Sequence, residues 1–217
     1  MTRRGYHQYC ATARTLDLVG ERWTLLIVRE LLTGPKRFKD LGDSLAGIGT
    51  GLLAERLKHL EAAGILRRAM LPPPAATPVY ELTPAGQDLE PAVLALARWG
   101  LRHAMGPRAE RDGFRPGWAV LGMQAAFDPV AAEGVVAVYE FRVGDAVFHA
   151  RVDGGRVSSR MGPADRPDAV IEADEETFAD LAHGRQRLRE AVRAGRARAT
   201  GDRAALTRLR SLFPPPV

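Results

Sequence analysis

Three glycines lie within five residues, at Gly47, Gly49 and Gly51, directly before a segment of helical character. A glycine-rich loop that opens a helix is typical of phosphate sites, because its backbone N–H groups point at the anion. A glycine-bearing turn between two short helices is equally typical of a DNA-binding helix-turn-helix. The sequence therefore poses a choice between nucleotide binding and DNA binding.

The residues that precede the glycines argue against a phosphate loop. Phosphate-binding loops follow a strand, whereas residues 37–45 place their apolar side chains at helical spacing. A dinucleotide fingerprint would need glycine where Leu52 stands, and the chain has no Gly-Lys-Ser/Thr sequence for a Walker loop. We therefore interpret the glycines as the turn of a helix-turn-helix.

Two amphipathic helices, at residues 36–45 and 49–64, and two strands, at 65–71 and 79–83, give the order of a winged helix. We expect Thr50 to cap the second helix and its leucines to face inward, so that the opposite face enters the major groove. The predicted base-facing residues are Thr50, Gly51, Glu55, Lys58 and His59. The predicted phosphate contacts are Lys36, Arg37, Lys39, Arg56, Arg67 and Arg68. An ordinary helical hairpin with a solvated charged face is the alternative.

The charge distribution supports a polyanionic partner. The formal net charge is +5 and the isoelectric point is about 9.9. Residues 1–72 hold twelve Lys or Arg against seven Asp or Glu, whereas residues 111–217 hold sixteen against fifteen. The basic excess thus accompanies the predicted helix-turn-helix and indicates double-stranded DNA. A merely soluble basic surface is the alternative.

The residues that usually carry catalysis are scattered. No His-Glu-X-X-His, paired-cysteine or Gly-X-Ser-X-Gly pattern occurs, so we expect no metal site, no cofactor and no enzyme. The acidic run 174–176 is interpreted as complementing a helix dipole. The arginine-rich run 187–203 suggests a second DNA surface, but its interspersed acids favour a solvated amphipathic face.

Further elements are expected on either side of residue 105. A helix covers residues 13–34, with a possible break at Gly20, and another covers 84–105. A Gly- and Pro-bearing linker, 106–116, precedes a mixed domain at 117–217 with helices and alternating strands. No run of about eighteen apolar residues and no signal peptide is found, and Cys10 is the single cysteine, so a cytoplasmic protein is expected.

Residues 9–105 resemble the HxlR family of winged-helix regulators. The resemblance is carried by Cys10, the run 20–23, Arg37-Phe38, Leu53, Arg56-Leu57, Leu60, Glu61, Gly64, the run 80–83 and Gly86. It implies a homodimer that binds a pseudo-palindromic operator, with the dimer formed by the helices at both ends of the domain. Gly51 and Ala54 replace the polar residues that relatives often carry, and the wing tip is nearly uncharged, so we expect few base contacts.

Residues 117–213 resemble the sterol carrier protein type 2-like fold. The resemblance rests on Ala173-Asp174, the helix at 178–181, the spacing of Gly195 from Gly201-Asp202, and a final amphipathic helix. It implies an α+β chain whose second domain holds an apolar small molecule or lipid. The predicted pocket residues are Trp118, Met123, Phe127, Tyr139, Phe141, Phe148, Met161 and Phe178. Each of these large side chains equally suits a filled core.

Together these patterns predict a homodimeric, ligand-controlled DNA-binding regulator that does not bind membranes. Two alternatives remain. Some relatives sense oxidants or electrophiles through the cysteine at the place of Cys10, whose thiolate a helix N-terminus would favour; a small packing residue is the other interpretation. The second alternative is a lipid carrier whose helical half is a docking module.

Overall fold

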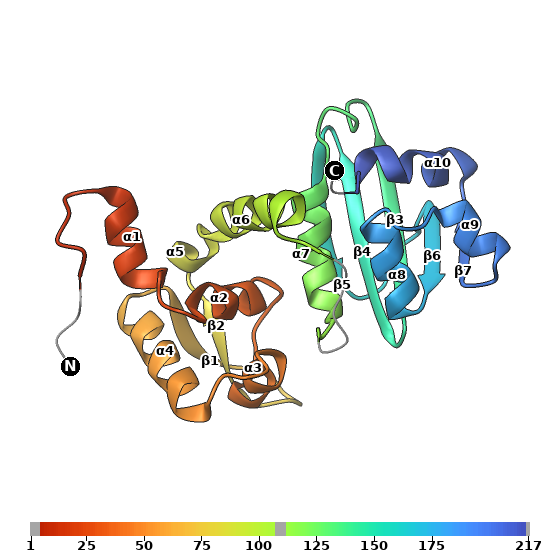
Figure 1. The fold of residues 1–217 in the computed structure, drawn as a ribbon. Helices are drawn as coiled ribbons and strands as arrows, with labels where there is room; N and C mark the ends of the chain where they lie inside the picture. Colours follow the sequence, from red (N-terminus) through yellow and green to blue (C-terminus); the bar gives the residue numbers. More distant parts are fainter. Residues whose placement is uncertain (1–4, 107–111, 216–217) are drawn as a thin grey trace. The chain divides into compact units, whose positions relative to one another are not determined.

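The computed structural model of the protein describes residues 5–106 and 112–215. By its internal contacts the chain divides into two compact units, Met1–Val93 and Leu94–Val217. Each unit contains a separate cluster of buried apolar side chains. Figure 1 shows the elements along the chain, and each unit is described below by itself.

The first unit consists of short helices and one β-hairpin. The elements are α1 (Ala11–Val19), α2 (Thr24–Leu32), α3 (Phe38–Ser44), α4 (Thr50–Ala62), β1 (Leu66–Met70), β2 (Pro78–Leu82) and α5 (Pro84–Gln87), and α6 (Glu90–His103) runs across the boundary between the units. The predicted break at Gly20 is confirmed. A Cβ at Gly20 would overlap the carbonyl oxygen of Leu16, and Trp23 adopts a left-handed conformation with φ 77° before α2 begins.

The single helix predicted at residues 84–105 is wrong, because the structure has two helices there. α5 ends at Gln87, and α6 begins at Glu90. Pro91 explains the break, since proline has no N–H to donate to the carbonyl four residues earlier. Proline is tolerated in the first turn of a helix, where it lies in α6.

Helix α4 lies on the core of the first unit through one leucine stripe. Leu53, Leu57 and Leu60 are each at most 1% exposed and share a cluster with Ile27 of α2 and Leu41 of α3. The expected cap is wrong. Gly49 is the N-cap, no side chain caps the helix, and Thr50 is the first helical residue.

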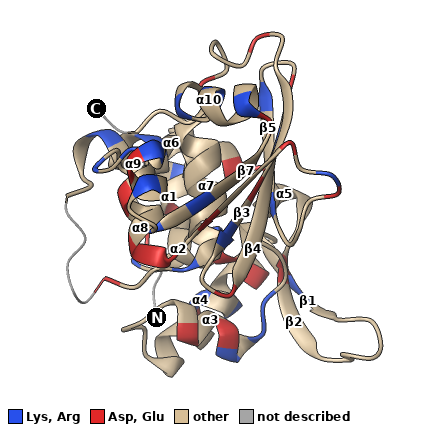
Figure 2. Cartoon of the chain, turned by 90° about the vertical axis from the view of Figure 1, so that its right-hand side faces the viewer, with Lys and Arg blue, Asp and Glu red and all other residues tan. Residues whose placement is uncertain are grey.

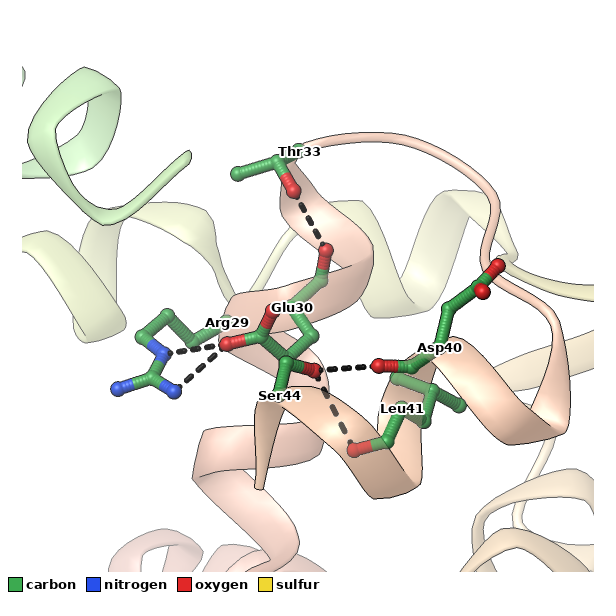
Figure 3. Close-up of polar contacts among 6 residues, drawn as sticks. All are labelled: Arg29, Glu30, Thr33, Asp40, Leu41 and Ser44. Carbon is green, nitrogen blue, oxygen red and sulfur yellow. Dashed lines mark hydrogen bonds and ion pairs between the residues drawn. The ribbon is translucent and has the colours of Figure 1, made fainter. Parts of the chain in front are cut away.

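Local polar contacts complete α2 and α3 around this core (Figure 3). Glu30 is only 4% exposed, and its carboxylate accepts hydrogen bonds from Nε and Nη2 of Arg29 at 3.1 and 2.6 Å. Near the C-terminus of α2, Thr33 Oγ1 donates to the carbonyl oxygen of Glu30 at 2.8 Å. In α3, Ser44 Oγ donates to the carbonyl oxygen of Asp40 at 2.8 Å. These contacts give the buried Glu30 carboxylate a partner and add one side-chain hydrogen bond to a main-chain carbonyl oxygen in each helix.

The predicted wing is an antiparallel hairpin. Strands β1 and β2 pair from Leu66↔Leu82 to Met70↔Pro78. Lys36 joins the hairpin beside β2, because its N–H donates to the carbonyl oxygen of Tyr80 at 3.0 Å and the Tyr80 N–H donates back at 2.8 Å. The chain that enters α3 is therefore fixed to the wing by its backbone.

The second unit is a five-stranded mixed sheet with helices. Its strands lie in the order β5-β4-β3-β6-β7, and the β3–β6 pair is parallel while the other pairs are antiparallel. The α+β class predicted from the sequence is thus confirmed. The elements are α7 (Pro116–Ala126), β3 (Val136–Val143), β4 (Ala146–Asp153), β5 (Arg156–Met161), β6 (Ala169–Ala173), α8 (Glu175–Ala182), α9 (Leu188–Arg193), β7 (Ala197–Gly201) and α10 (Arg203–Leu212).

One face of this sheet carries the core of the second unit. Alternate residues of β3, including Tyr139 and Phe141, are buried with Phe148 of β4 and Phe178 of α8. Tyr139 also holds the last helix, since its hydroxyl donates to the carbonyl oxygen of Ala205 at 3.1 Å. Burial of this phenol raises the pKa of Tyr139 to about 12.

Gly86 gives a test of how tightly α5 packs against the hairpin. A Cβ at Gly86 would overlap the carbonyl oxygen of Ile65, so we expect Gly86→Ala to lower the free energy of unfolding by about 1–3 kcal/mol. Gly51→Ala is the matched control, because no atom lies within 4 Å of its added Cβ and a helical alanine stabilises by about 0.4–1 kcal/mol. Urea unfolding measures both changes, and equal stabilities would contradict the close approach.

Candidate DNA interface and ligand cavity

The outer face of α4 is exposed to solvent because the opposite face of the helix is buried in the core. Thr50, Gly51, Glu55 and Lys58 are all exposed on the helix whose leucines are buried. Among the residues that the structure describes, no carboxylate lies within ion-pair distance of Lys58. A helix with a solvated outer face followed by a hairpin is the arrangement that winged helices use in the major groove.

Two of the predicted DNA contacts are engaged within the first unit. The Arg56 side chain is 15% exposed, with Nη2 at 3.1 Å from Glu21 and Nη1 at 3.3 Å from Glu55. His59 Nε2 donates to the carbonyl oxygen of Leu18 at 3.0 Å, since a carbonyl can only accept. Arg56 and His59 therefore tie α4 to the segment around the end of α1.

The predicted phosphate contacts occupy two other places. Lys36 is half-buried just before α3, and Arg37 and Lys39 are exposed at its start. In β1 the exposed side chain of Arg67 pairs with Glu81 at 2.7 Å, and that of Arg68 pairs with Glu61 at 3.4 Å. Such exposed pairs contribute little stability, so both arginines remain able to exchange a carboxylate for a phosphate.

The second unit contains a cavity of about 500 Å³. Four of the predicted pocket residues line it, namely Trp118, Met123, Phe141 and Phe178. The other predicted residues lie elsewhere: Phe127, Tyr139 and Phe148 are buried in the core without lining the cavity, and Met161 is 43% exposed on β5.

The sequence did not predict several other apolar residues that line the cavity. Among them are Phe114, Ile171, Leu188, Leu206, Leu209 and Phe213. The apolar spacing of the last helix was a usable signal, because Leu206 and Leu209 lie on its inner side. Gly122 of α7 also lines the cavity, and no atom lies within 4 Å of a Cβ placed there.

A few polar groups interrupt the apolar lining. His183 donates through Nδ1 to the carbonyl oxygen of Ala179 at 2.7 Å, and Gln186 is only 9% exposed. Among the described residues, neither His183 Nε2 nor Gln186 Oε1 has a hydrogen-bond partner. Arg185 and Arg210 also line the cavity. An apolar cavity with few polar groups is typical of a small-molecule site.

Cys10 lies at the N-terminus of α1 and is exposed. The backbone N–H of Ala13, and then that of Thr12, lower the pKa of the Cys10 thiol. This is the environment in which a helix N-terminus favours a thiolate.

The described ranges, 5–106 and 112–215, contain neither a metal-binding cluster nor a membrane-spanning helix. No group of three or more His, Cys, Asp or Glu side chains is placed to hold a metal ion. No helix there combines the length and the apolar composition needed to cross a bilayer.

Comparison with known proteins covers both halves of the chain. Residues 18–107 match the family described as HxlR-like helix-turn-helix, and residues 124–214 match the SCP-2 sterol transfer family. An uncharacterized HTH-type transcriptional regulator of Mycobacterium tuberculosis is 42% identical over 90 residues, which are 42% of this chain and 56% of that protein. This chain thus spans little more than half of that relative.

One Bacillus subtilis protein is covered more fully, both as a sequence and as a crystal structure. The HTH-type transcriptional regulator YodB is 39% identical over 83 residues, 38% of this chain and 74% of its own length. A crystal structure of quinone-bound YodB superposes with a TM-score of 0.36 at 34% identity, covering 41% of this chain and 93% of that one. By its likeness to YodB over 74% of that protein, the chain belongs to the HxlR-like helix-turn-helix family, and its residues 124–214 match the model of the SCP-2 sterol transfer family.

Proposed function

We propose that this protein is a homodimeric transcriptional regulator that binds a pseudo-palindromic DNA operator and responds to an apolar small molecule. The likeness to YodB, 39% identity across 74% of that regulator, is the observation that carries the proposal. We place the DNA-binding and dimerisation domain at residues 1–105, the linker at 106–116 and the ligand domain at 117–217. Of the linker, residues 107–111 lie outside the described residues.

The exposed face of α4 supports the DNA-binding part. We assign Thr50, Gly51, Glu55 and Lys58 to the bases, because all four lie on that face. Base reading by His59 would require it to leave the Leu18 carbonyl oxygen. The phosphate contacts in this proposal are Lys36, Arg37, Lys39, Arg56, Arg67 and Arg68, so affinity should fall steeply with salt.

Lys58 gives the sharpest test of this interface. Since it is exposed on the outer face of α4, we expect Lys58→Ala to weaken operator binding by roughly 1–3 kcal/mol. Fluorescence anisotropy with DNA from upstream of the protein's own gene measures the affinity at several salt concentrations, against a scrambled competitor. Arg151→Ala, which removes one exposed cation from β4 of the second unit, outside the proposed operator interface, is the control. An unchanged affinity would remove Lys58 from the interface.

The cavity of the second unit supports the ligand-binding part. Its lining combines aromatic and aliphatic side chains from α7, β3, α8 and α10. A ligand there would control DNA binding by preferring one dimer geometry, since a ligand shifts an equilibrium only by its differential affinity for the two states.

Filling the cavity tests whether it binds apolar small molecules. Gly122→Leu adds a side chain where no atom lies within 4 Å of the Cβ, so we expect an apolar fluorescent dye to bind about tenfold more weakly. Ala204→Leu places the same leucine side chain at an exposed position of α10 and serves as the control. Dye fluorescence titration measures binding. Equal dye affinity in both variants would place the dye site elsewhere.

The environment of Cys10 favours a second candidate function, a regulator that senses thiol-reactive compounds. In this alternative the second unit is only a brace for the dimer. The thiol is exposed, and the N–H groups of Ala13 and Thr12 stabilise its charged form.

The reactivity of Cys10 should depend on pH in a defined direction. Because the thiol pKa is lowered, the thiolate is present at lower pH in the folded protein than in the unfolded chain. We expect the pH profile of iodoacetamide alkylation to lie at lower pH for the native protein than for the same protein in urea. Identical profiles would contradict an activated thiol.

If the protein senses oxidants, Cys10→Ser abolishes that response and leaves the response to an apolar ligand intact.

A lipid carrier with a helical docking module predicts no salt-sensitive DNA binding, and the anisotropy titration separates it from a regulator. In our proposal the protein is not an enzyme, acts in the cytoplasm and needs neither a cofactor nor a membrane.

A further inference from the structure

Arginines are concentrated near the end of the second unit. Between Arg185 and Arg210 the sequence has nine arginines and only two acidic residues, Glu190 and Asp202. No lysine occurs in this segment. In the sequence, the interspersed acidic residues favour a solvated amphipathic face over a second DNA surface. That interpretation depends on whether Glu190 and Asp202 neutralise the arginines.

Both acidic side chains accept hydrogen bonds from backbone N–H groups at the start of a helix. Glu190 Oε2 accepts from the backbone N–H of Arg187 at 3.2 Å, and Asp202 Oδ1 accepts from that of Ala205 at 2.7 Å. Among the described residues, the one ion pair made by an arginine of this segment joins Arg185 to Asp180 at 2.7 Å. The positive charge of the other arginines is therefore not cancelled by neighbouring carboxylates in ion pairs.

Helix α9 directs two arginines away from the fold. Ala191 is fully buried, and at 100° per residue Arg189 and Arg193 lie on the opposite side of the helix. Both are exposed. They are four positions apart, about 6 Å along the helix axis.

Helix α10 adds one more exposed arginine. Ala205 and Leu212 are buried at 5% and 0% exposure, and Arg203 lies on the outer side. Arg210 lines the cavity and is left out. We call Arg187, at the N-cap of α9, together with Arg189, Arg193 and Arg203 the α9–α10 arginine surface. Helices α9 and α10 both pack against β7. Figure 2 looks onto this side of the second unit and shows Lys/Arg segments on both helices.

We propose that the α9–α10 arginine surface binds the phosphate backbone of double-stranded DNA, as a second contact besides the first unit. Arginine suits phosphate because its planar guanidinium donates two parallel hydrogen bonds. An anionic membrane is the other polyanion to consider, but docking there also needs apolar side chains to insert. Among the described residues from 185 to 213, Val192 is the one large apolar side chain that is clearly exposed, at 40%.

Acidic residues near the surface limit its extent. The run 174–176 begins α8, and the charge of Arg196 contributes to lowering the pKa of Asp174. We therefore leave Arg196 out. Arg198 is left out as well, because it lies opposite Glu172 in the β6–β7 pair.

The test uses the full chain and a nonspecific duplex, because phosphate contacts do not depend on sequence. Anisotropy titrations between 50 and 200 mM salt give the slope of log K against log salt concentration. Each lost phosphate contact reduces that slope by about 0.9. For Arg189→Gln/Arg193→Gln/Arg203→Gln we expect a slope shallower by about two to three and binding at least about tenfold weaker at low salt.

The control variant is Arg151→Gln/Arg156→Gln/Arg160→Gln. It removes the same charge from three exposed positions of β4 and β5, at the other end of the strand order from β7. The proposal predicts a slope close to wild type for this control. An unchanged slope in the α9–α10 variant, or an equal loss in both variants, would overturn it. Thermal melts confirm that the substituted chains fold.

This inference rests on the DNA binding proposed above, and different variants test the two proposals. Lys58→Ala tests operator binding by the first unit, whereas the α9–α10 variant tests a nonspecific contact of the second. Co-sedimentation with vesicles of phosphatidylcholine and phosphatidylglycerol addresses the membrane. If the α9–α10 variant loses vesicle binding but keeps the wild-type DNA slope, the surface binds membranes and our proposal is wrong.

Discussion

The burial of Leu53, Leu57 and Leu60 is the constraint on which the first unit depends. Each is at most 1% exposed, and together they fix the rotation of α4 about its axis. Because a helix repeats every 3.6 residues, burying one stripe necessarily presents the opposite stripe to solvent. Lys58 and Glu55 are therefore exposed as a consequence of core packing, whatever they contact.

In the second unit, burial of one face of a strand likewise fixes which side chains lie on the other face. Alternation along β3 places Tyr139 and Phe141 on the helix-covered face and Glu140 and Arg142 on the other. Even the buried Glu140 is satisfied there, since it accepts hydrogen bonds from Arg142 and from the Ala164 N–H, both at 2.8 Å. The rings of Phe141, Phe148 and Phe178 pack within 6.0 Å of one another, yet space remains between α7, α8 and α10. The cavity is thus bounded by residues that also hold the core.

The two units differ in how their arginines are paired with acidic residues. Acidic residues at the starts of α9 and α10 bind backbone N–H groups, which leaves the neighbouring arginines without ion-pair partners. In the first unit, by contrast, Arg56 is drawn into contacts with Glu21 and Glu55. The sequence shows only that all these residues are arginines. The structure shows which of them have no ion-pair partner among the described residues and can bind a phosphate without first releasing a carboxylate.

The sequence by itself determined the order of elements, the α+β class and the buried stripe of α4, because helix and strand periodicities are local properties. It also determined the break at Gly20, but a single helix was predicted where Pro91 separates α5 from α6. Only the tertiary structure decided the partners of side chains. His59 is held by Leu18, 41 positions away, and Met161 lies outside the cavity that Phe213 lines. These contacts join residues that are distant along the chain, and periodicity carries no information about which distant residues meet.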